Sequence, residues 1–292
     1  MGDEPPGVGA GETGEAAYSP PVNRLLTLGD VRGQREWHDY QQYGLGREHI
    51  PDLIRMATDP DLNWADPDSA EVWAPLHAWR ALGQLHAEEA VGPLLGLLEE
   101  LEDSDWFNED LPEVFSLIGP AAIPASIAYL AEGRHGLWPR VTVARCLERI
   151  GADHPEVRDA CVAALTRPLE AFRRNDPILN ANVVLALTNL RATEALPLIE
   201  RAFAADAVDL TLMGDWEDVQ IEFGLKAERD TPRPNYFAMM MAGDPRPRGP
   251  RPVIVPAQGS GTEANRRATA ARKTKGKRKA AAESRRRNRK RR

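Results

Sequence analysis

The chain has 292 residues, of which 42% are hydrophobic, and a formal net charge of −7 from 37 basic and 44 acidic residues. No apolar stretch approaches the roughly 18 residues of a membrane helix, and the acidic N-terminus lacks a secretory signal, so we expect neither a membrane nor a secreted protein. Its two cysteines, Cys146 and Cys161, fall on core-like helix positions. Two cysteines make no disulfide framework, which favours buried thiols and a reducing, cytoplasmic location (nuclear in a nucleated cell).

The small net charge conceals two oppositely charged parts of the chain. Residues 266–292 contain fifteen Lys or Arg and one acid, Glu283, and therefore carry a net charge of +14. Residues 1–265 contain 22 bases and 43 acids, a net charge of −21. We therefore expect the two parts to attract partners of opposite charge.

Composition also divides the chain into four segments. Residues 1–21 are rich in Gly, Pro and acid, and we expect disorder because they bury too little apolar surface to offset the ordering entropy. Residues 22–225 are expected to form the folded body, 226–265 a Pro- and Gly-rich linker, and 266–292 a disordered basic tail. The linker contains a small apolar cluster that we expect to cap the last helices of the body: Tyr236, Phe237, Met239, Met240 and Met241.

Apolar residues recur at helical spacing throughout the body, with offsets of three, four and seven positions. Six such stripes predict an all-α fold: Ile50, Leu53, Ile54 and Ala57; Val91, Leu94, Leu95 and Leu98; Leu111, Val114, Phe115 and Ile118; Ile123, Ile127 and Leu130; Val143, Leu147 and Ile150; Val183, Val184, Leu187 and Leu190.

The order of the predicted helices repeats along the chain. Turns are expected near Gly83, Gly119, Gly151 and Leu190, at separations of 36, 32 and 39 residues. Such a period is typical of helical solenoids. The second helix of each pair has an early proline, which a first helical turn tolerates because its N–H would be unpaired there: Pro51, Pro93, Pro124 and Pro197.

Three segments carry a family resemblance: 79–95 (WRALGQLHAEEAVGPLL), 115–124 (FSLIGPAAIP) and 185–199 (LALTNLRATEALPLI). They resemble HEAT repeats of the type named after phycobilisome lyases, over roughly residues 33–225. The resemblance implies an α-solenoid of about five helical hairpins. The apolar stripes favour the same architecture, because a single hairpin cannot bury its apolar stripe without stacked neighbours.

Motifs for catalysis, metal or cofactor binding are weak. The glycines of Gly9-x-Gly11-x-x-Gly14 follow no predicted strand, so they offer no phosphate cradle. The six histidines form no His-x-x-x-His pair, and the aspartates between Asp59 and Asp68 lack the calcium-loop spacing. We therefore predict no catalytic residue, metal or cofactor. The alternative is a lyase-like or metal-dependent protein-modifying enzyme of the HEAT-like class.

Four tryptophans fall in or just after the predicted connections between hairpins, together with many acids. In a solenoid these connections share one edge. One hypothesis is that each tryptophan seals its repeat against the next. The other is an acidic and aromatic edge that binds a basic protein segment, formed by Trp64, Asp66, Trp106, Trp138, Asp215 and Trp216.

The tail has no aromatic residue among its bases, so it offers phosphate attraction without base stacking. The cations expected to meet nucleic acid, the ribosome or another polyanion are Arg272, Lys273, Lys275, Lys277, Arg278, Lys279, Arg285, Arg286, Arg287, Arg289, Lys290, Arg291 and Arg292. Alternatives are a solubilising or autoinhibitory tail that folds back on the acidic body, and an address read by a protein. The combined prediction is a non-catalytic adaptor that binds a protein partner and, through the tail, a polyanion.

Overall fold

The computed structural model describes residues 18–31 and 36–236, and all regular structure in this part is helical. This confirms the predicted all-α class. The described part also includes four residues that were assigned to the disordered N-terminus. Tyr18 is only 3% exposed and its hydroxyl donates to Asp59 Oδ2 at 2.8 Å. The folded body therefore begins before residue 22.

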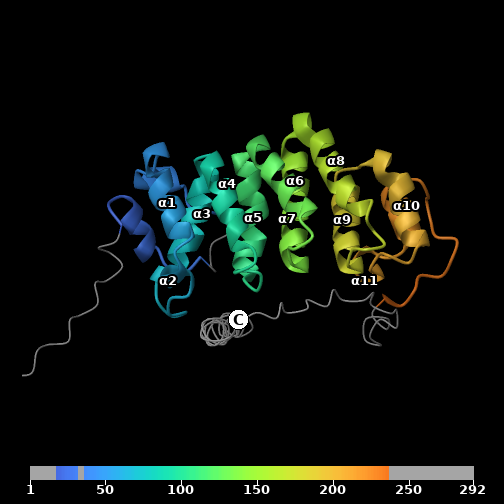
Figure 1. Cartoon of the computed structure of the whole chain (residues 1–292), viewed down its shortest axis with the longest axis horizontal. Coiled ribbons are helices and arrows are strands. Elements are labelled where there is room, and N and C mark those ends of the chain that lie inside the picture. The colour runs from blue at the N-terminus through green and yellow to red at the C-terminus, as the bar shows by residue number, and fades with distance from the viewer. Residues whose placement is uncertain (1–17, 32–35, 237–292) are drawn as a thin grey trace, which may run out of the picture.

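The longer helices form two rows that run side by side (Figure 1). In the first row, each helix packs against the next: α3 (Ala74–Gln84), α5 (Asp105–Ile118), α7 (Leu137–Asp153) and α9 (Pro177–Asn189). The second row is built in the same way: α4 (Val91–Leu97), α6 (Ile123–Ala131), α8 (Arg158–Leu169) and α10 (Leu196–Ala204). The chain alternates between the rows, and one continuous core of aliphatic and aromatic side chains lies between them.

Shorter elements close the two ends of the rows. At the N-terminal end, α1 (Ile50–Ala57) and two 3-10 helices, η2 (Val22–Thr27) and η3 (Tyr40–Tyr43), pack against α3. The remaining short elements lie in connections or at the C-terminal end: α2 (Pro60–Asn63), η5 (Glu71–Trp73), α11 (Leu210–Met213) and α12 (Trp216–Glu222).

Each helix of the second row follows directly on a three-residue 3-10 turn. These turns are η6 (Glu88–Ala90), η7 (Pro120–Ala122), η8 (Pro155–Val157) and η9 (Thr193–Ala195), and η4 (Arg47–His49) precedes α1 in the same way. The early prolines lie in first helical turns as predicted, in α1, α4, α6 and α10. Proline thus marks where the tight turn widens into an α-helix.

Two of these turns have the same backbone design. His86 and Arg191 adopt positive φ angles of 50° and 53°, and the following alanine N–H in each case donates to the leucine carbonyl five residues earlier, at 3.0 and 2.9 Å. This bond satisfies a carbonyl that the helix end leaves open.

An arginine links successive turns in a repeated way. Arg158 donates to the Leu190 carbonyl at 2.9 Å and to Glu194 at 3.0 Å. Arg47 makes the matching contacts to the Leu85 carbonyl at 3.4 Å and to Glu89 at 3.5 Å.

The glycines near two predicted turns serve helix packing. Gly83 lies inside α3, where a Cβ would come within 3.2 Å of the Val114 Cα on α5. Gly151 lies inside α7, where a Cβ would come within 3.0 Å of the Cys161 Cβ. The turns follow these glycines by a few residues. By contrast, Gly119 does end α5, with φ +87°.

By length and hydropathy, no helix of the described part qualifies alone as a membrane span; α5 and the segment Pro120–Ala131 qualify only as a pair bent by 115°.

Candidate functional site

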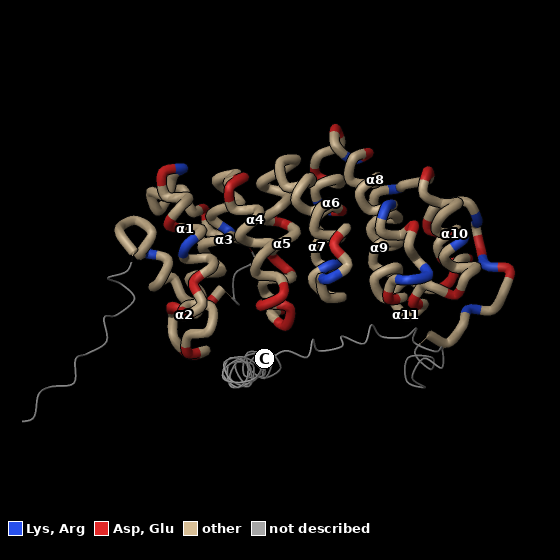
Figure 2. Tube along the Cα trace, viewed as in Figure 1, with Lys and Arg blue, Asp and Glu red and all other residues tan. Residues whose placement is uncertain are grey.

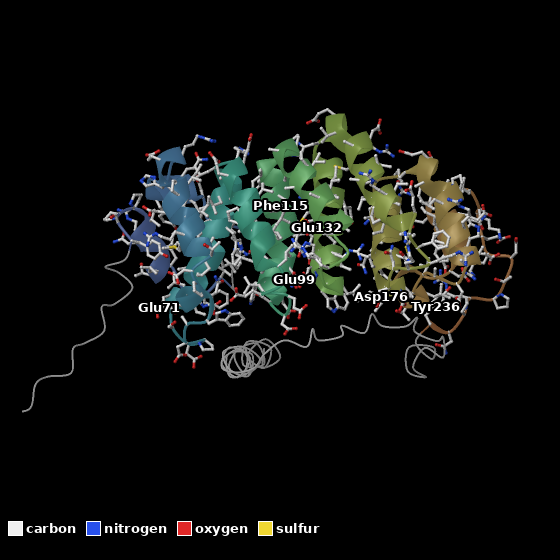
Figure 3. All side chains as sticks on the ribbon, viewed as in Figure 1. Glu71, Glu99, Phe115, Glu132, Asp176 and Tyr236 are labelled. Atoms are coloured by element: carbon white, nitrogen blue, oxygen red, sulfur yellow. The ribbon has the colours of Figure 1, made fainter. Side chains whose placement is uncertain are left out.

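The longer connections, which lead from one helix pair to the next, lie along one edge of the molecule. We call the segments 58–73, 98–104, 132–136, 170–176 and 205–215 the connection edge. In Figure 1, α2 and α11, which belong to the segments 58–73 and 205–215, lie at the lower ends of the helices. In Figure 3, Glu71, Glu99 and Asp176 lie along this side of the view.

Aspartate and serine side chains start helices along this edge. Asp59, Ser104, Asp176, Asp209 and Asp215 each accept a hydrogen bond from a backbone N–H in the first turn of the helix that follows. Such caps satisfy amides that lack a helical partner, and a carboxylate there also interacts favourably with the helix dipole. Part of the acidity of the edge is therefore needed by the fold itself.

Two adjacent glutamates join three successive connections. Glu100 accepts from Trp64 Nε1 at 3.0 Å, in the connection before it. Glu99 accepts from the Gly136 N–H at 3.0 Å and contacts His135 Nδ1 at 3.1 Å, in the connection after it. At the far end, the buried Asn180 side chain donates to the Phe172 and Ala207 carbonyls at 2.9 and 2.7 Å. Hydrogen bonds between neighbours thus hold the edge together.

The N-terminal half of the described body is strongly acidic. Residues 36–131 contain 19 carboxylates and three arginines, a net charge of −16. All three arginines are held by carboxylates of the same region: Arg47 by Glu89, Arg55 by Asp52 and Arg80 by Asp110. Figure 2 shows Asp and Glu positions gathered at the lower ends of α2 and α5. The edge segments 58–73 and 98–104 hold nine of these carboxylates and no Lys or Arg, so this part of the edge presents a negative potential.

The four predicted edge tryptophans have different environments. Trp64, Trp106 and Trp216 are partly buried against the core, and Trp106 stands edge-to-face on the buried Trp73 ring with centroids 5.7 Å apart. These three side chains seal the helix ends, as the packing hypothesis expected. Trp138, in the first turn of α7, is 52% exposed and is the tryptophan of this set with a free ring surface to offer a partner.

The two predicted edge aspartates are both used in local structure. Asp66 is exposed, and its Oδ1 accepts from the Asp68 N–H at 2.9 Å in the connection before α3. Asp215 is the N-cap of α12 and binds Arg229 through both carboxylate oxygens, at 2.8 and 2.7 Å. The Arg229 side chain hydrogen-bonds to this carboxyl and keeps its pKa below the usual range. The negative charge of Asp215 is therefore already paired within the chain.

The beginning of the linker docks on α12. Lys226 binds Glu217 at 2.7 Å, and the Tyr236 hydroxyl donates to Asp218 Oδ2 at 2.6 Å. Burial raises the pKa of Asp218, but the hydrogen bonds from Tyr236, Arg229 and Arg233 outweigh it and lower the pKa to about 2. Residues 226–236 therefore contact the last helix, Tyr236 through its hydroxyl; Phe237 and Met239–Met241 of the predicted cluster lie outside the described residues.

The cysteine and histidine side chains of the described residues differ in exposure: His77 is buried, and the other five histidines are partly or fully exposed. Both cysteines are buried thiols, and burial raises the pKa of Cys161 to about 11, which disfavours the reactive thiolate. No group of three or more His, Cys, Asp or Glu side chains in this part is placed to hold a metal ion. Comparison of the chain with protein-family models, curated proteins and solved structures gives no match.

Two buried polar clusters were not predicted from the sequence. Arg80 and Asp110 form an ion pair between α3 and α5 that is capped by Trp79 and by the Trp37 ring. His77 bridges the Tyr40 hydroxyl and the Gly29 carbonyl, at 2.8 and 2.9 Å. One sequence feature could have indicated these clusters. Three polar residues, His77, Arg80 and Gln84, recur at offsets of three and four along an otherwise apolar helix.

The cations of the basic tail, 266–292, lie outside the described residues.

Proposed function

We propose that this chain is a non-catalytic binding scaffold, a HEAT-like α-solenoid of about five hairpins, whose connection edge holds a basic segment of a partner protein. The observation that carries the proposal is the −16 charge of residues 36–131, in which every arginine is already paired internally. A partner that supplies Lys or Arg would meet the carboxylates of the edge segments 58–73 and 98–104, which contain no Lys or Arg.

Trp138 supports the same proposal from the middle of the edge. Its ring is half-exposed, and it lies two residues after Gly136, whose N–H binds Glu99 of the preceding acidic connection. An aromatic surface beside carboxylates suits a basic segment, because a Lys or Arg side chain stacked on the ring would gain roughly 0.5–2 kcal/mol.

The tail has a separate role in this proposal, which is contact with nucleic acid or another polyanion. If about six of its cations meet phosphates, the slope of log K against log salt would be roughly −4 to −5. Fold-back of the tail onto the acidic half competes with that contact, because the two are tethered in one chain. The isolated tail is therefore expected to bind a polyanion more tightly than the intact protein does.

Affinity capture with the full chain and with a variant lacking 266–292, each with and without nuclease, tests the proposal. We expect a protein partner to be captured after nuclease treatment and also by the variant without the tail. We expect nucleic acid to be captured only when the tail is present. A partner lost on nuclease treatment would remove the protein-binding role. A charge-reversed edge, Asp68→Lys with Asp103→Lys, should release the partner. The control Glu88→Lys with Glu200→Lys has the same charge change away from this edge, and both pairs are exposed.

A further inference from the structure

A groove runs along α8 in the second row of helices and reaches the connection edge at Glu170. It is open to solvent, has a volume of about 1000 Å³, and is bordered by α6, α8 and the turn η9. Its floor is apolar, with Ile127 from α6 and the exposed Ala160 and Ala163 from α8. Small side chains on the floor let another backbone approach α8 closely.

A second hollow, of about 440 Å³, continues the groove past the end of α8. Glu170 borders both hollows, so they form one surface. The other side chains around the second hollow include Phe172 and three arginines, Arg173, Arg174 and Arg201. Arg167 borders the first hollow one helical turn before Glu170.

The two ends of the groove differ in charge. At the beginning of α8, Asp159 and Glu194 both bind Arg158, at 2.7 and 3.0 Å, so these three side chains together keep one negative charge. The opposite end carries four exposed arginines for which no ion pair is found among the described residues: Arg167, Arg173, Arg174 and Arg201.

The arginine end is unusual for this molecule. Arginines elsewhere in the described body typically bind carboxylates, as Arg80, Arg149 and Arg158 do. The helix dipole of α8 accounts for one cation, Arg167, near its C-terminal end. It does not account for Arg173, Arg174 and Arg201, which come from the following connection and from α10. Three cations around the second hollow of an acidic chain, with Arg167 on the adjoining hollow, indicate an anionic ligand.

We infer that the groove binds an amphipathic helix of a partner protein, with apolar residues against the alanine floor and carboxylates against the arginine end. A helix of about 12 residues spans roughly 18 Å, which is the length of α8 itself, Arg158–Leu169. Apolar anchors at offsets of three, four and seven are the usual contacts of a helix laid in a groove. A nucleic acid strand fits less well, because the floor is aliphatic and offers no exposed aromatic ring for base stacking.

Peptide selection from a random display library against the full-length protein tests this inference. Two groove variants are compared with the parent chain: Arg173→Glu with Arg174→Glu reverses the charge of one end, and Ala163→Trp fills the floor. The matched controls are Arg24→Glu with Arg145→Glu and Ala152→Trp, all at exposed positions outside the groove. All variants keep the basic tail, so a difference between them isolates the groove from the tail, and circular dichroism checks that each is folded.

We expect the selected peptides to carry apolar residues at helical spacing with acids toward one end. Their affinity should fall at least about tenfold in each groove variant and less than about twofold in the controls, because apposed like charges at an interface are costly. A selection without that pattern would overturn the inference, as would peptides that keep their affinity for the charge-reversed groove. Selected peptides that bind the basic tail instead of the groove would also overturn the inference. Failure here is distinguishable from failure of the proposed function, because Asp68 and Asp103, which test that function, border neither hollow.

Discussion

Arg80 and Asp110 form a two-point ion pair in the interior, between α3 and α5. Arg80 Nε lies 2.6 Å and Nη2 3.0 Å from the two carboxylate oxygens, and the side chains are 7% and 10% exposed. The indole of Trp79 donates to the same carboxylate at 3.2 Å, and the guanidinium lies 4.7 Å from the Trp37 ring centroid. The pair joins neighbouring helices and fixes how the N-terminal segment covers α3.

Removal of one member of this pair should destabilise the protein strongly. Asp110→Ala leaves Arg80 buried without its counter-charge, and we expect the free energy of unfolding to fall by about 3–5 kcal/mol. Replacing both residues by apolar ones, Arg80→Met with Asp110→Leu, should cost much less, since neither charge then remains buried. Urea denaturation of the single and double variants measures this difference. Equal losses in the two variants would contradict the assignment.

His77 should make the N-terminal segment sensitive to acid. Its Nε2–H donates to the Gly29 carbonyl and its Nδ1 accepts from the Tyr40 hydroxyl, which is the neutral ring. Burial lowers its pKa from 6.5 to about 4. The unfolded chain therefore takes up the proton first as the pH falls. The free energy of unfolding should decline between about pH 6.5 and pH 4, by about 3 kcal/mol at most, and change no further from this source below pH 4.

The variant His77→Gln tests that pH dependence, since it keeps a donor for the Gly29 carbonyl but does not titrate. Denaturation at pH 7, 5.5 and 4 should show a steeper loss for the parent chain than for the variant. Parallel curves would show that another group is responsible.

Much of the helical framework could be predicted from the sequence. Stripes such as Leu111 to Ile118 identify helices whatever lies beside them, and Pro51 or Pro197 marks a first turn by a local rule. The packing role of Gly151 could not be predicted, because it depends on Cys161 and Leu190 lying opposite it. The same holds for the groove, whose lining joins Ile127, Arg167 and Arg201 only after the second row of helices has formed.

The position of the connection edge could be predicted from the sequence, but the exposure of its tryptophan rings could not. Connections between stacked helices share an edge by topology, so Trp64 and Trp106 could be placed there. Whether a ring seals the core or faces solvent depends on what packs on it. Trp73 covers part of Trp106, whereas Trp138 remains 52% exposed.

The docked linker should depend on Arg229 more than on its neighbour Arg233. Arg229 binds Asp215 and Asp218 together and its side chain is 12% exposed, whereas Arg233 contacts Asp218 alone and is 68% exposed. Arg229→Met should therefore speed amide hydrogen exchange across 226–236, and Arg233→Met should leave it nearly unchanged. Because the pKa of Asp218 lies near 2, below its usual 3.8, protection should persist above pH 4 and decline only as the pH falls toward 2. Equal exchange in both variants would argue against this network.

Alanine substitutions of Trp138 and Trp106 should differ in their effects on partner binding and on stability. Trp138→Ala removes an exposed ring, so the free energy of unfolding should change by less than about 0.5 kcal/mol while partner binding weakens. Trp106→Ala removes a ring packed on Trp73 and should cost about 2 kcal/mol of stability. Thermal melts and capture yields for both variants check this contrast. A destabilised Trp138→Ala that still retains the partner would assign that ring to packing as well.

The most direct test of the acidic edge as a site for basic segments is a calorimetric titration. A synthetic peptide of residues 266–292 serves as the basic segment, added to protein that lacks those residues at about 0.05 M salt. We predict binding that weakens with salt and falls at least about tenfold in Asp68→Lys with Asp103→Lys, but far less in Glu88→Lys with Glu200→Lys. Absence of binding, or equal losses in the two reversed pairs, would contradict a basic-segment site on the connection edge.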